Sequence, residues 1–412
     1  MNARSESSYR PAEAGRAAQA VALGLVLLTV SWALLHAGFY ERNQIIDTPV
    51  YEGYGEKILD GEMPYRDYTV EYPPAALPVF VLPALANKQD YKTAFELLMW
   101  ACAAAAVVLM GSALAAASAA PARLYGATAF LGLTPLALGS VILTRFDLWP
   151  AVLTVGAVAA LAAGRGRLGL GVLGLATAAK LYPAVIAPIA LVWLWRRRGV
   201  REAAVGLAVF LAVAAVVMLP FAALAPHGFG HSFSAQLRRP LQIESLGSAL
   251  LLAAHQVGLY DPRIESTHGS QNLAGSLPDA LASVQTALQL VALVIVWTVF
   301  ARAREADSNR LFAGAAASVA AFVAFGKVLS PQFLIWLLPL VPLVAEGLGV
   351  TACGTLAVIL IVTQLWFPYR YWHVVGLGAS GWLVLVRDLL LLVLFALLTA
   401  ATARRYAAPR SS

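Results

Sequence analysis

The sequence predicts an all-α polytopic membrane protein, a bundle of about twelve transmembrane helices, and three observations lead to this fold class. Hydrophobic residues make up 60% of the 412 and charged residues only 12%, whereas soluble domains have about 45–50% and about 25%. Apolar runs long enough for helices recur from Ala17 to Ala403. The two cysteines, Cys102 and Cys353, lie inside such runs, which excludes a disulfide framework and a CxxC metal or redox site.

The first expected helix follows directly from a polar N-terminal tail, residues 1–16. The apolar run 17–39 is longer than the core of a signal peptide and lacks a clear small-residue cleavage site, so we interpret it as a retained span. A second short tail covers 404–412. Between the tails we expect a single domain over 17–403, with further spans at 93–118, 122–142, 147–163, 167–180, 181–195, 201–224, 281–303, 309–326, 331–347, 349–367 and 377–403.

The apolar stretch 73–87 is too short to be assigned as a span by length alone. If it does not cross, the segments on one side of the membrane hold sixteen Arg, six acids and no Lys, which marks that side as cytoplasmic. If it does cross, Arg165 and Arg167 move outside. The charges therefore predict interfacial helices here. They place both termini in the cytoplasm, and the loops 40–92 and 225–280 on the extracytoplasmic side of a plasma membrane.

Acidic and aromatic residues are concentrated in the first of these loops. Residues 40–72 hold eight acids against three bases, with tyrosines between them. Carboxylates and ring faces suit sugar recognition, because hydroxyls need acceptors and sugar rings pack on flat surfaces; a hydrated loop with interfacial tyrosines is the alternative. Asp47 precedes a short helix expected at about 49–60, so a helix N-cap is the structural alternative for this residue.

Four single cations lie at similar depth on the extracytoplasmic side, which suggests an anionic ligand such as a lipid phosphate. They are Arg145, Lys180, Lys327 and Arg370. Each could instead have a purely structural role. Arg145 could pair with Asp147 inside the membrane, Lys180 could snorkel to the headgroups, and a charge-balanced bundle would show the same pattern.

The loop 225–280 carries Arg238-Arg239-Pro240, Glu244-Ser245 and a short helix expected at 247–256 with Ser245 as its cap. The sequence has no HExxH, GxSxG, P-loop or EF-hand pattern. Its histidines have no metal-ligand spacing, so we predict no metal site.

Six motifs in chain order resemble glycosyltransferase family 87. They are Asp47-x-x-Val50-Tyr51, Gly61-x-x-Pro64-Tyr65-x-Asp67, Glu71-Tyr72-Pro73-Pro74, Lys180-Leu181-Tyr182-Pro183, Glu244-Ser245 and the run from Ser330 to Pro339. Members of this family are integral membrane enzymes of the GT-C fold and include α-mannosyltransferases that use polyprenyl-phosphate-mannose. Because an acid of the first extracytoplasmic loop is the base or its neighbour in GT-C enzymes, the resemblance implies that Asp47 is catalytic.

The resemblance further implies transfer of a sugar, mannose first among the candidates, from a polyprenyl-phosphate donor to a cell-envelope glycolipid or glycan, with inversion. General-base catalysis needs one carboxylate, and the leaving phosphate needs cations, for which the four named above are the candidates. No cofactor, divalent metal or nucleic acid is expected. The remaining candidate substrate contacts are Tyr51, Glu71, Tyr72, His227 and His231.

Two further classes of function compete with an enzyme. A transporter or flippase of a polyprenyl-linked glycan would use the same basic vestibule without a base. The absence of a recognisable inverted repeat and the concentration of polar sequence on one face count against it. A non-catalytic membrane scaffold would leave the carboxylates of the first loop unexplained.

Overall fold

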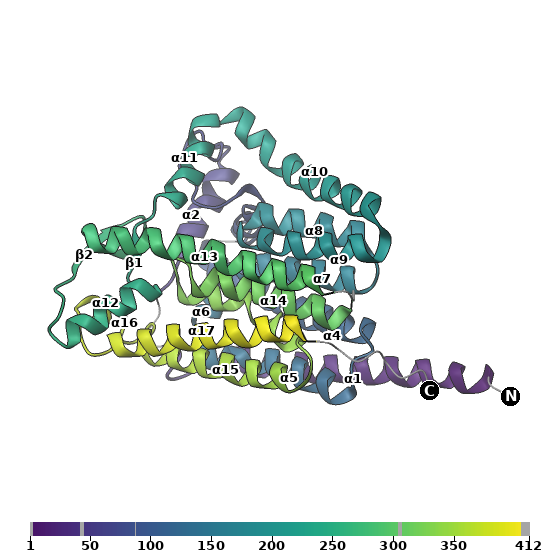
Figure 1. Ribbon diagram of the computed structural model, residues 1–412. Helices are drawn as coiled ribbons and strands as arrows, with labels where there is room; N and C mark the ends of the chain where they lie inside the picture. The colour runs from purple at the N-terminus through teal and green to yellow at the C-terminus, as the bar shows by residue number, and fades with distance from the viewer. Residues whose placement is uncertain (1–2, 42–44, 87, 304–306, 405–412) are drawn as a thin grey trace.

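The computed structural model describes residues 3–41, 45–86, 88–303 and 307–404. Its helices form a bundle whose long axes run in roughly one direction (Figure 1). Within the described residues, six helices are long and apolar enough to cross a membrane, which confirms a polytopic membrane protein. They are α1 (Ala3–Leu34), α4 (Tyr91–Ala116), α10 (Val200–Leu224), α13 (Ser276–Arg302), α15 (Glu346–Trp366) and α17 (Gly381–Ala403).

Shorter helices fill the space between the long ones. Their lengths follow the punctuation of the sequence, because Pro opens several of these helices and Gly with a positive φ closes others. They are α5 (Pro121–Leu138), α6 (Val141–Thr144), α7 (Leu148–Ala162), α8 (Gly166–Ala179), α9 (Ala187–Arg198), preceded by the 3₁₀ turn η3 (Tyr182–Ile186), and α14 (Ser308–Ala324).

The span expected at 331–347 is not an α-helix, so this prediction was wrong. The segment forms two 3₁₀ stretches, η4 (Pro331–Trp336) and η5 (Val341–Leu343), because its three prolines remove the N–H donors that an α-helix needs. Residues 334–345 are all buried. Non-helical backbone is tolerated at membrane depth only where protein surrounds it, so this segment forms the centre of the bundle.

The first loop contains α2 (Thr48–Leu59), the 3₁₀ turn η1 (Pro74–Ala76), α3 (Pro78–Ala84) and the 3₁₀ turn η2 (Lys88–Asp90). The helix expected at 49–60 is thus confirmed. At 1.5 Å per residue α3 is about 10 Å long, far less than the roughly 30 Å of a bilayer core. The backbone of α2 lies against that of α3, because a Cβ on Gly55 would overlap the Phe80 carbonyl oxygen.

The loop 225–280 has more structure than the sequence predicts. It forms α11 (Pro226–Leu237), β1 (Leu241–Gln242), α12 (Leu246–Gln256), β2 (Arg263–Thr267) and β3 (Ser270–Ala274). The strands make an antiparallel sheet in the order β1-β3-β2. Residues His268 and Gly269 close the β2–β3 hairpin with φ values of 55° and 65°, as a two-residue hairpin turn of type I′ requires.

Ser245 precedes α12 as expected but does not cap it. Its hydroxyl donates instead to Gln285 Oε1 of α13 at 3.4 Å, and the same oxygen accepts the N–H of Gly247 at 2.8 Å. A side chain of α13 therefore satisfies the first turn of α12, which fixes the sheet and α12 to the membrane bundle.

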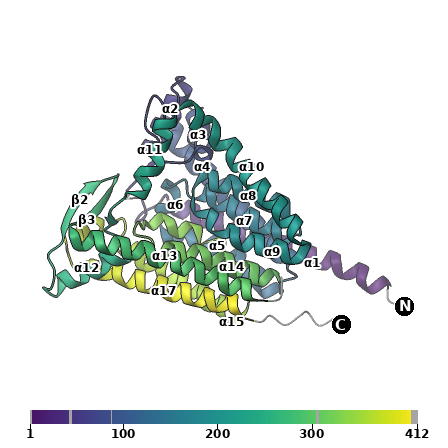
Figure 2. The same cartoon turned by 45° about the horizontal axis from the view of Figure 1, so that its top comes forward.

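The two ends of the bundle differ in character. The start of α1 and the end of α17 lie at one end, and the sheet, α11, α12 and α16 (Tyr371–Val375) lie at the other (Figure 1). Helix α10 packs on α8 and α9 and diverges from α13 toward α11, as both views show (Figure 2). Only 6% of the most apolar 18-residue stretch of α10 is buried inside the protein. Most of the surface of this helix is therefore available to lipid.

Candidate functional site

A cavity of about 510 Å³ lies at the end of the bundle that carries the sheet. Its walls come from the first loop, the turns around α6–α7 and α8–η3, α11, the β2–β3 hairpin, α13 and the segment 326–336. Its polar and charged lining residues are Asp47, Glu71, Tyr72, Arg145, Lys180, Tyr182, Ser232, Gln236, Arg239, Gln242, Glu244, His268, Ser270, Thr286, Gln289, Lys327, Ser330, Gln332 and Tyr371.

Asp47 lies at the start of α2, but its side chain makes no capping hydrogen bond. The carboxylate forms an ion pair with Arg145 instead, and Arg145 also donates to the Ile45 carbonyl at 3.2 Å. The Asp47 side chain is 33% exposed while that of Arg145 is 6% exposed. The structure therefore rejects the N-cap alternative: a buried cation holds the Asp47 carboxylate at the cavity wall, where part of it remains accessible.

A second ion pair joins the start of α7 to the end of α8. Asp147 is fully buried and contacts Lys180 Nζ at 2.5 Å, and it accepts a hydrogen bond from Trp336 Nε1 at 2.6 Å. The Lys180 ammonium lies over several aromatic rings, those of Phe146 and Trp336 at 4.6 and 5.2 Å. Lys180 does reach the cavity, as predicted, but an acid already compensates its charge. Arg145 pairs with Asp47 rather than with Asp147.

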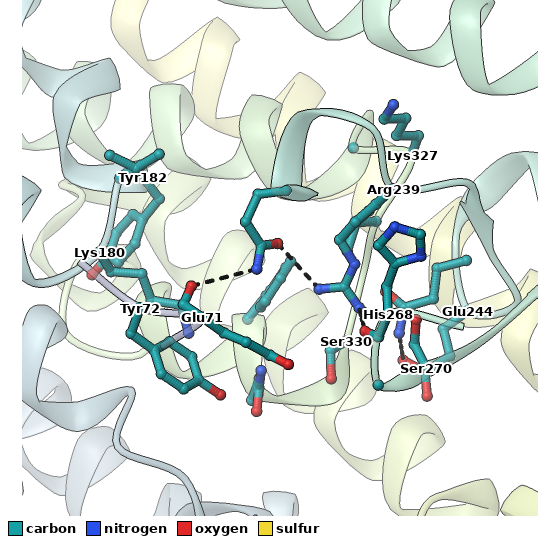
Figure 3. Close-up of a pocket in the computed structure, with 18 of the residues that line it drawn as sticks. Glu71, Tyr72, Lys180, Tyr182, Arg239, Glu244, His268, Ser270, Lys327 and Ser330 are labelled. Carbon is teal, nitrogen blue, oxygen red and sulfur yellow. Dashed lines mark hydrogen bonds between the residues drawn. The ribbon is translucent and has the colours of Figure 1, made fainter. Parts of the chain in front are cut away.

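Arg239 enters the cavity from the chain that follows α11, a position that the sequence did not single out from its neighbour Arg238. Its guanidinium donates to Gln236 Oε1 at 3.3 Å, to the His268 carbonyl at 3.1 Å and to Ser270 Oγ at 2.9 Å. Gln236 in turn donates to the Glu71 carbonyl at 3.5 Å. Figure 3 shows this chain of contacts crossing the cavity from Glu71 to the tip of the hairpin.

Glu244 is a buried acid of the cavity wall, 2% exposed. Gln242 Nε2 donates to its carboxyl at 3.3 Å, and Arg387 of α17 donates to its backbone carbonyl at 2.6 Å. Burial raises the pKa of Glu244 from 4.5 to about 8, while the charges of Arg387, Arg145 and Arg239 oppose this shift. The sequence marks Glu244 through its motif, but burial beside arginines could not be read from it.

Of the predicted substrate contacts, Glu71 and Tyr72 line the cavity. Tyr51 does not: it is completely buried and stacks on Phe80, with ring centroids 4.6 Å apart. The Tyr72 ring packs edge-on against Phe146 at 4.8 Å, so the aromatic cluster behind it supports the cavity wall. The interleaved tyrosines of the first loop are thus partly core residues.

Three more of the predicted residues lie outside the cavity. His227 and His231 are exposed on α11, whose cavity-lining residues are Ser232, Phe233, Gln236 and Leu237. Arg370 is exposed and donates to the Leu365 carbonyl. Its neighbours Phe367 and Tyr371 reach the cavity instead. The fourth predicted cation, Lys327, lines the cavity and donates to the Leu237 carbonyl at 2.9 Å.

Over the described residues, no three His, Cys, Asp or Glu side chains are grouped so that they could hold a metal ion. The acids of the cavity are distributed around its walls, and Asp47 contacts a basic side chain there. The walls of the cavity present two accessible carboxylates, Asp47 and Glu71, one buried carboxyl group, Glu244, and several cations around a common space.

The sequence matches the family model of glycosyltransferase family 87 over residues 68–331. This match covers more than half of the chain. The protein belongs to glycosyltransferase family 87. It is therefore a membrane glycosyltransferase, an enzyme that transfers a sugar to an acceptor. The matched region contains Glu71, Lys180, Arg239 and Glu244, whereas Asp47 precedes it. No curated protein matches the sequence.

Proposed function

We propose that this family 87 glycosyltransferase transfers a sugar, most simply mannose, from a polyprenyl-phosphate donor to a glycolipid or glycan of the cell envelope. The transfer takes place on the extracytoplasmic side of the plasma membrane and inverts the anomeric carbon. The observation that carries this proposal is the accessible Asp47 carboxylate in a cavity whose walls also present cations.

Asp47 acts as the general base in this mechanism. It takes the proton of the acceptor hydroxyl as the acceptor oxygen bonds to the anomeric carbon. The bond between that carbon and the phosphate oxygen breaks on the opposite face, and its electron pair leaves with the polyprenyl phosphate. Arg145 orients Asp47, and cations of the cavity stabilise the phosphate charge. Lys180 and Lys327 are the two of the four predicted cations that remain for this role. The mechanism uses no divalent metal.

The position of the cavity suits one lipid substrate and one substrate with a polar head. Thr286 and Gln289 on α13 and Phe322 on α14 line it, so it extends to the depth of the membrane helices. Glu71, Tyr72 and the hairpin tip line its outer part. His227 and His231, on the exposed face of α11, could meet only the distal part of an acceptor. Arg370, outside the cavity, has no place in the proposal.

A transporter is the alternative, and the centre of the bundle argues against it. Alternating access needs a path lined from both sides of the membrane. Here the buried residues 334–345 occupy the centre, and the polar lining of the cavity comes from one end only. A buried protein segment at the centre of the bundle favours a reaction over passage of a glycan.

The test is a transfer assay with the full chain in nanodiscs. Radiolabelled polyprenyl-phosphate-mannose is supplied together with envelope glycolipids, and the product linkage is determined by NMR. We expect labelled glycolipid with the anomeric configuration opposite to that of the donor. If the protein used a nucleotide sugar and did not use a lipid-linked donor, the proposal would be contradicted. If labelled lipid crossed the membrane without transfer of its sugar, the transporter would be supported.

A further inference from the structure

The cations of the cavity differ in how much of their charge is already compensated. Arg145 contacts Asp47, and Lys180 contacts the fully buried Asp147. A lipid phosphodiester carries one negative charge, and it gains a second when the sugar leaves. A cation that is already paired with a buried acid binds a phosphate less strongly, because the phosphate must compete with the carboxylate that is already there.

Arg239 differs from both of these residues. In the part of the chain that the structure describes, no acid forms an ion pair with its guanidinium, and it donates to the Gln236 amide oxygen, the His268 backbone carbonyl and the Ser270 hydroxyl. Glu71 and Glu244 act on its charge only from a longer distance. Its Nε atom is buried and has no hydrogen-bond partner. A buried donor without a partner costs free energy, and the side chain that carries it lines the cavity.

Further donor groups surround Arg239. Lys327, His268, Ser270 and Ser330 lie on its side of the cavity, whereas Lys180, Tyr182, Tyr72 and Glu71 lie on the other side (Figure 3). Lys327 donates to the Leu237 carbonyl, and its ammonium points away from the Arg239 guanidinium (Figure 3). The guanidinium and the two hydroxyls of this wall match the oxygens of a phosphate group, and the Glu244 carboxyl lies on the same side.

We infer that Arg239 binds the phosphate of the lipid donor and takes up the charge released when the sugar leaves. Lys180 then serves mainly to neutralise Asp147 and to position the aromatic wall. This inference rests on the proposed function, since it names the group that recognises the phosphate of the proposed donor. The position of Arg239 also links phosphate binding to the hairpin tip, through His268 and Ser270.

The experiment measures binding of farnesyl phosphate, a short polyprenyl phosphate, to the full chain in nanodiscs by calorimetry, with farnesol as the uncharged probe. For Arg239→Gln we expect a dissociation constant about ten- to a hundredfold higher for farnesyl phosphate, the ratio that follows from losing one charged hydrogen bond. Farnesol binding should not change. Arg239→Lys keeps the charge but loses the fork of donors, so its dissociation constant for farnesyl phosphate should lie between those of the wild type and Arg239→Gln.

Two control variants separate charge from structure. Arg238→Gln changes the adjacent exposed arginine, which does not line the cavity, and should bind like the wild type. Ser270→Ala removes one contact between Arg239 and the hairpin and one hydroxyl of the same wall while keeping the cation, so it should weaken binding much less than Arg239→Gln. If Ser270→Ala weakens binding as much as Arg239→Gln, hairpin placement and not the cation is responsible, and the inference fails.

The remaining outcomes distinguish this inference from the proposed function. If the wild type binds farnesyl phosphate and Arg239→Gln binds it equally well, the inference is wrong and the function stands. If only Lys180→Met lost binding of farnesyl phosphate, Lys180 and not Arg239 would be the residue that binds the phosphate. If the wild type binds farnesyl phosphate no better than farnesol, recognition of a lipid phosphate itself is refuted, and with it the proposed donor.

Discussion

At the scale of single residues, the mechanism depends most on Asp47. We expect Asp47→Asn to fold and to bind farnesyl phosphate, because the amide can still accept a hydrogen bond from Arg145 and no capping contact is lost. The amide cannot take a proton, so sugar transfer should fall by about 10²–10⁴-fold, the usual contribution of a general base. Initial rates with the lipid-linked donor measure this effect.

Two outcomes decide between interpretations of this variant. Transfer near the wild-type rate would remove Asp47 from the mechanism and direct attention to Glu71, the other exposed acid of the cavity wall. Loss of folding together with activity would mean that the ion pair with Arg145 is structural first. A normal dissociation constant for farnesyl phosphate with a slow reaction is the result that supports a base.

Glu244 provides a prediction about pH. Its pKa rises from 4.5 to about 8 on folding, chiefly through burial, so the folded protein holds a proton that the unfolded chain has released over that range. This contribution to stability is fully present below about pH 4.5 and is lost as the pH rises to about 8. Thermal unfolding in detergent from about pH 5 to about pH 8 should therefore show the wild type losing stability relative to Glu244→Gln. If the melting temperatures of the two proteins changed in parallel with pH, this prediction would be contradicted.

How far the sequence predicts this site depends on the kind of contact. Glu71 and Lys180 belong to short motifs next to helix ends, so their positions near the membrane surface follow from local sequence. The role of Arg239 does not, because burial separates it from the exposed Arg238 only after β1, β2 and β3 pair through contacts between distant residues. The ion pair of Lys180 with Asp147, and of Arg145 with Asp47, likewise joins distant segments.

At the scale of elements, α8 and α10 make a close contact between backbones. A Cβ on Gly174 would lie 2.5 Å from the Phe210 carbonyl oxygen, so the backbones touch where only glycine fits. Because α10 diverges from α13 and packs mainly on α8 and α9, we expect Gly174→Ala to destabilise the protein by about 1–3 kcal/mol, the usual cost of overpacking.

Gly126→Ala on α5 is the matched control, since nothing lies within 4 Å of a Cβ there. Thermal unfolding in the same detergent compares the two variants, and the control should match the wild type or exceed it slightly, because alanine favours a helix. Equal melting temperatures for all three proteins would show that α10 can move away from α8 without loss.

The elements that the sequence predicts best are those whose apolar runs are long and lack closely spaced prolines. The run 201–224 agrees with α10 almost residue for residue. The run from Pro331 is equally apolar, yet its prolines make it a buried 3₁₀ segment. Hydropathy alone cannot distinguish a helix that faces lipid from a segment buried in protein, because both environments require apolar side chains.

At the scale of the whole molecule, the arrangement of the bundle supports the charge argument made from the sequence. The start of α1 and the end of α17 lie at the end of the bundle opposite the cavity (Figure 1). The arginines at the end of α9 belong to one of the segments that the positive-inside rule assigns to the cytoplasm. We therefore expect the cavity, at the opposite end of the bundle, to face the extracytoplasmic side.

Labelling of introduced cysteines tests this orientation. With Cys102 and Cys353 replaced by alanine, Ala86→Cys just after α3 and Arg165→Cys between α7 and α8 are both exposed positions. Since α3 is about 10 Å long and cannot cross, we expect a membrane-impermeant maleimide to label the thiol at position 86 from outside intact cells. The thiol at position 165 should be labelled only after permeabilisation. The reverse pattern, with position 165 labelled from outside and position 86 only after permeabilisation, would mean that the segment 73–86 crosses, and it would move the arginine-rich loop at position 165 outside.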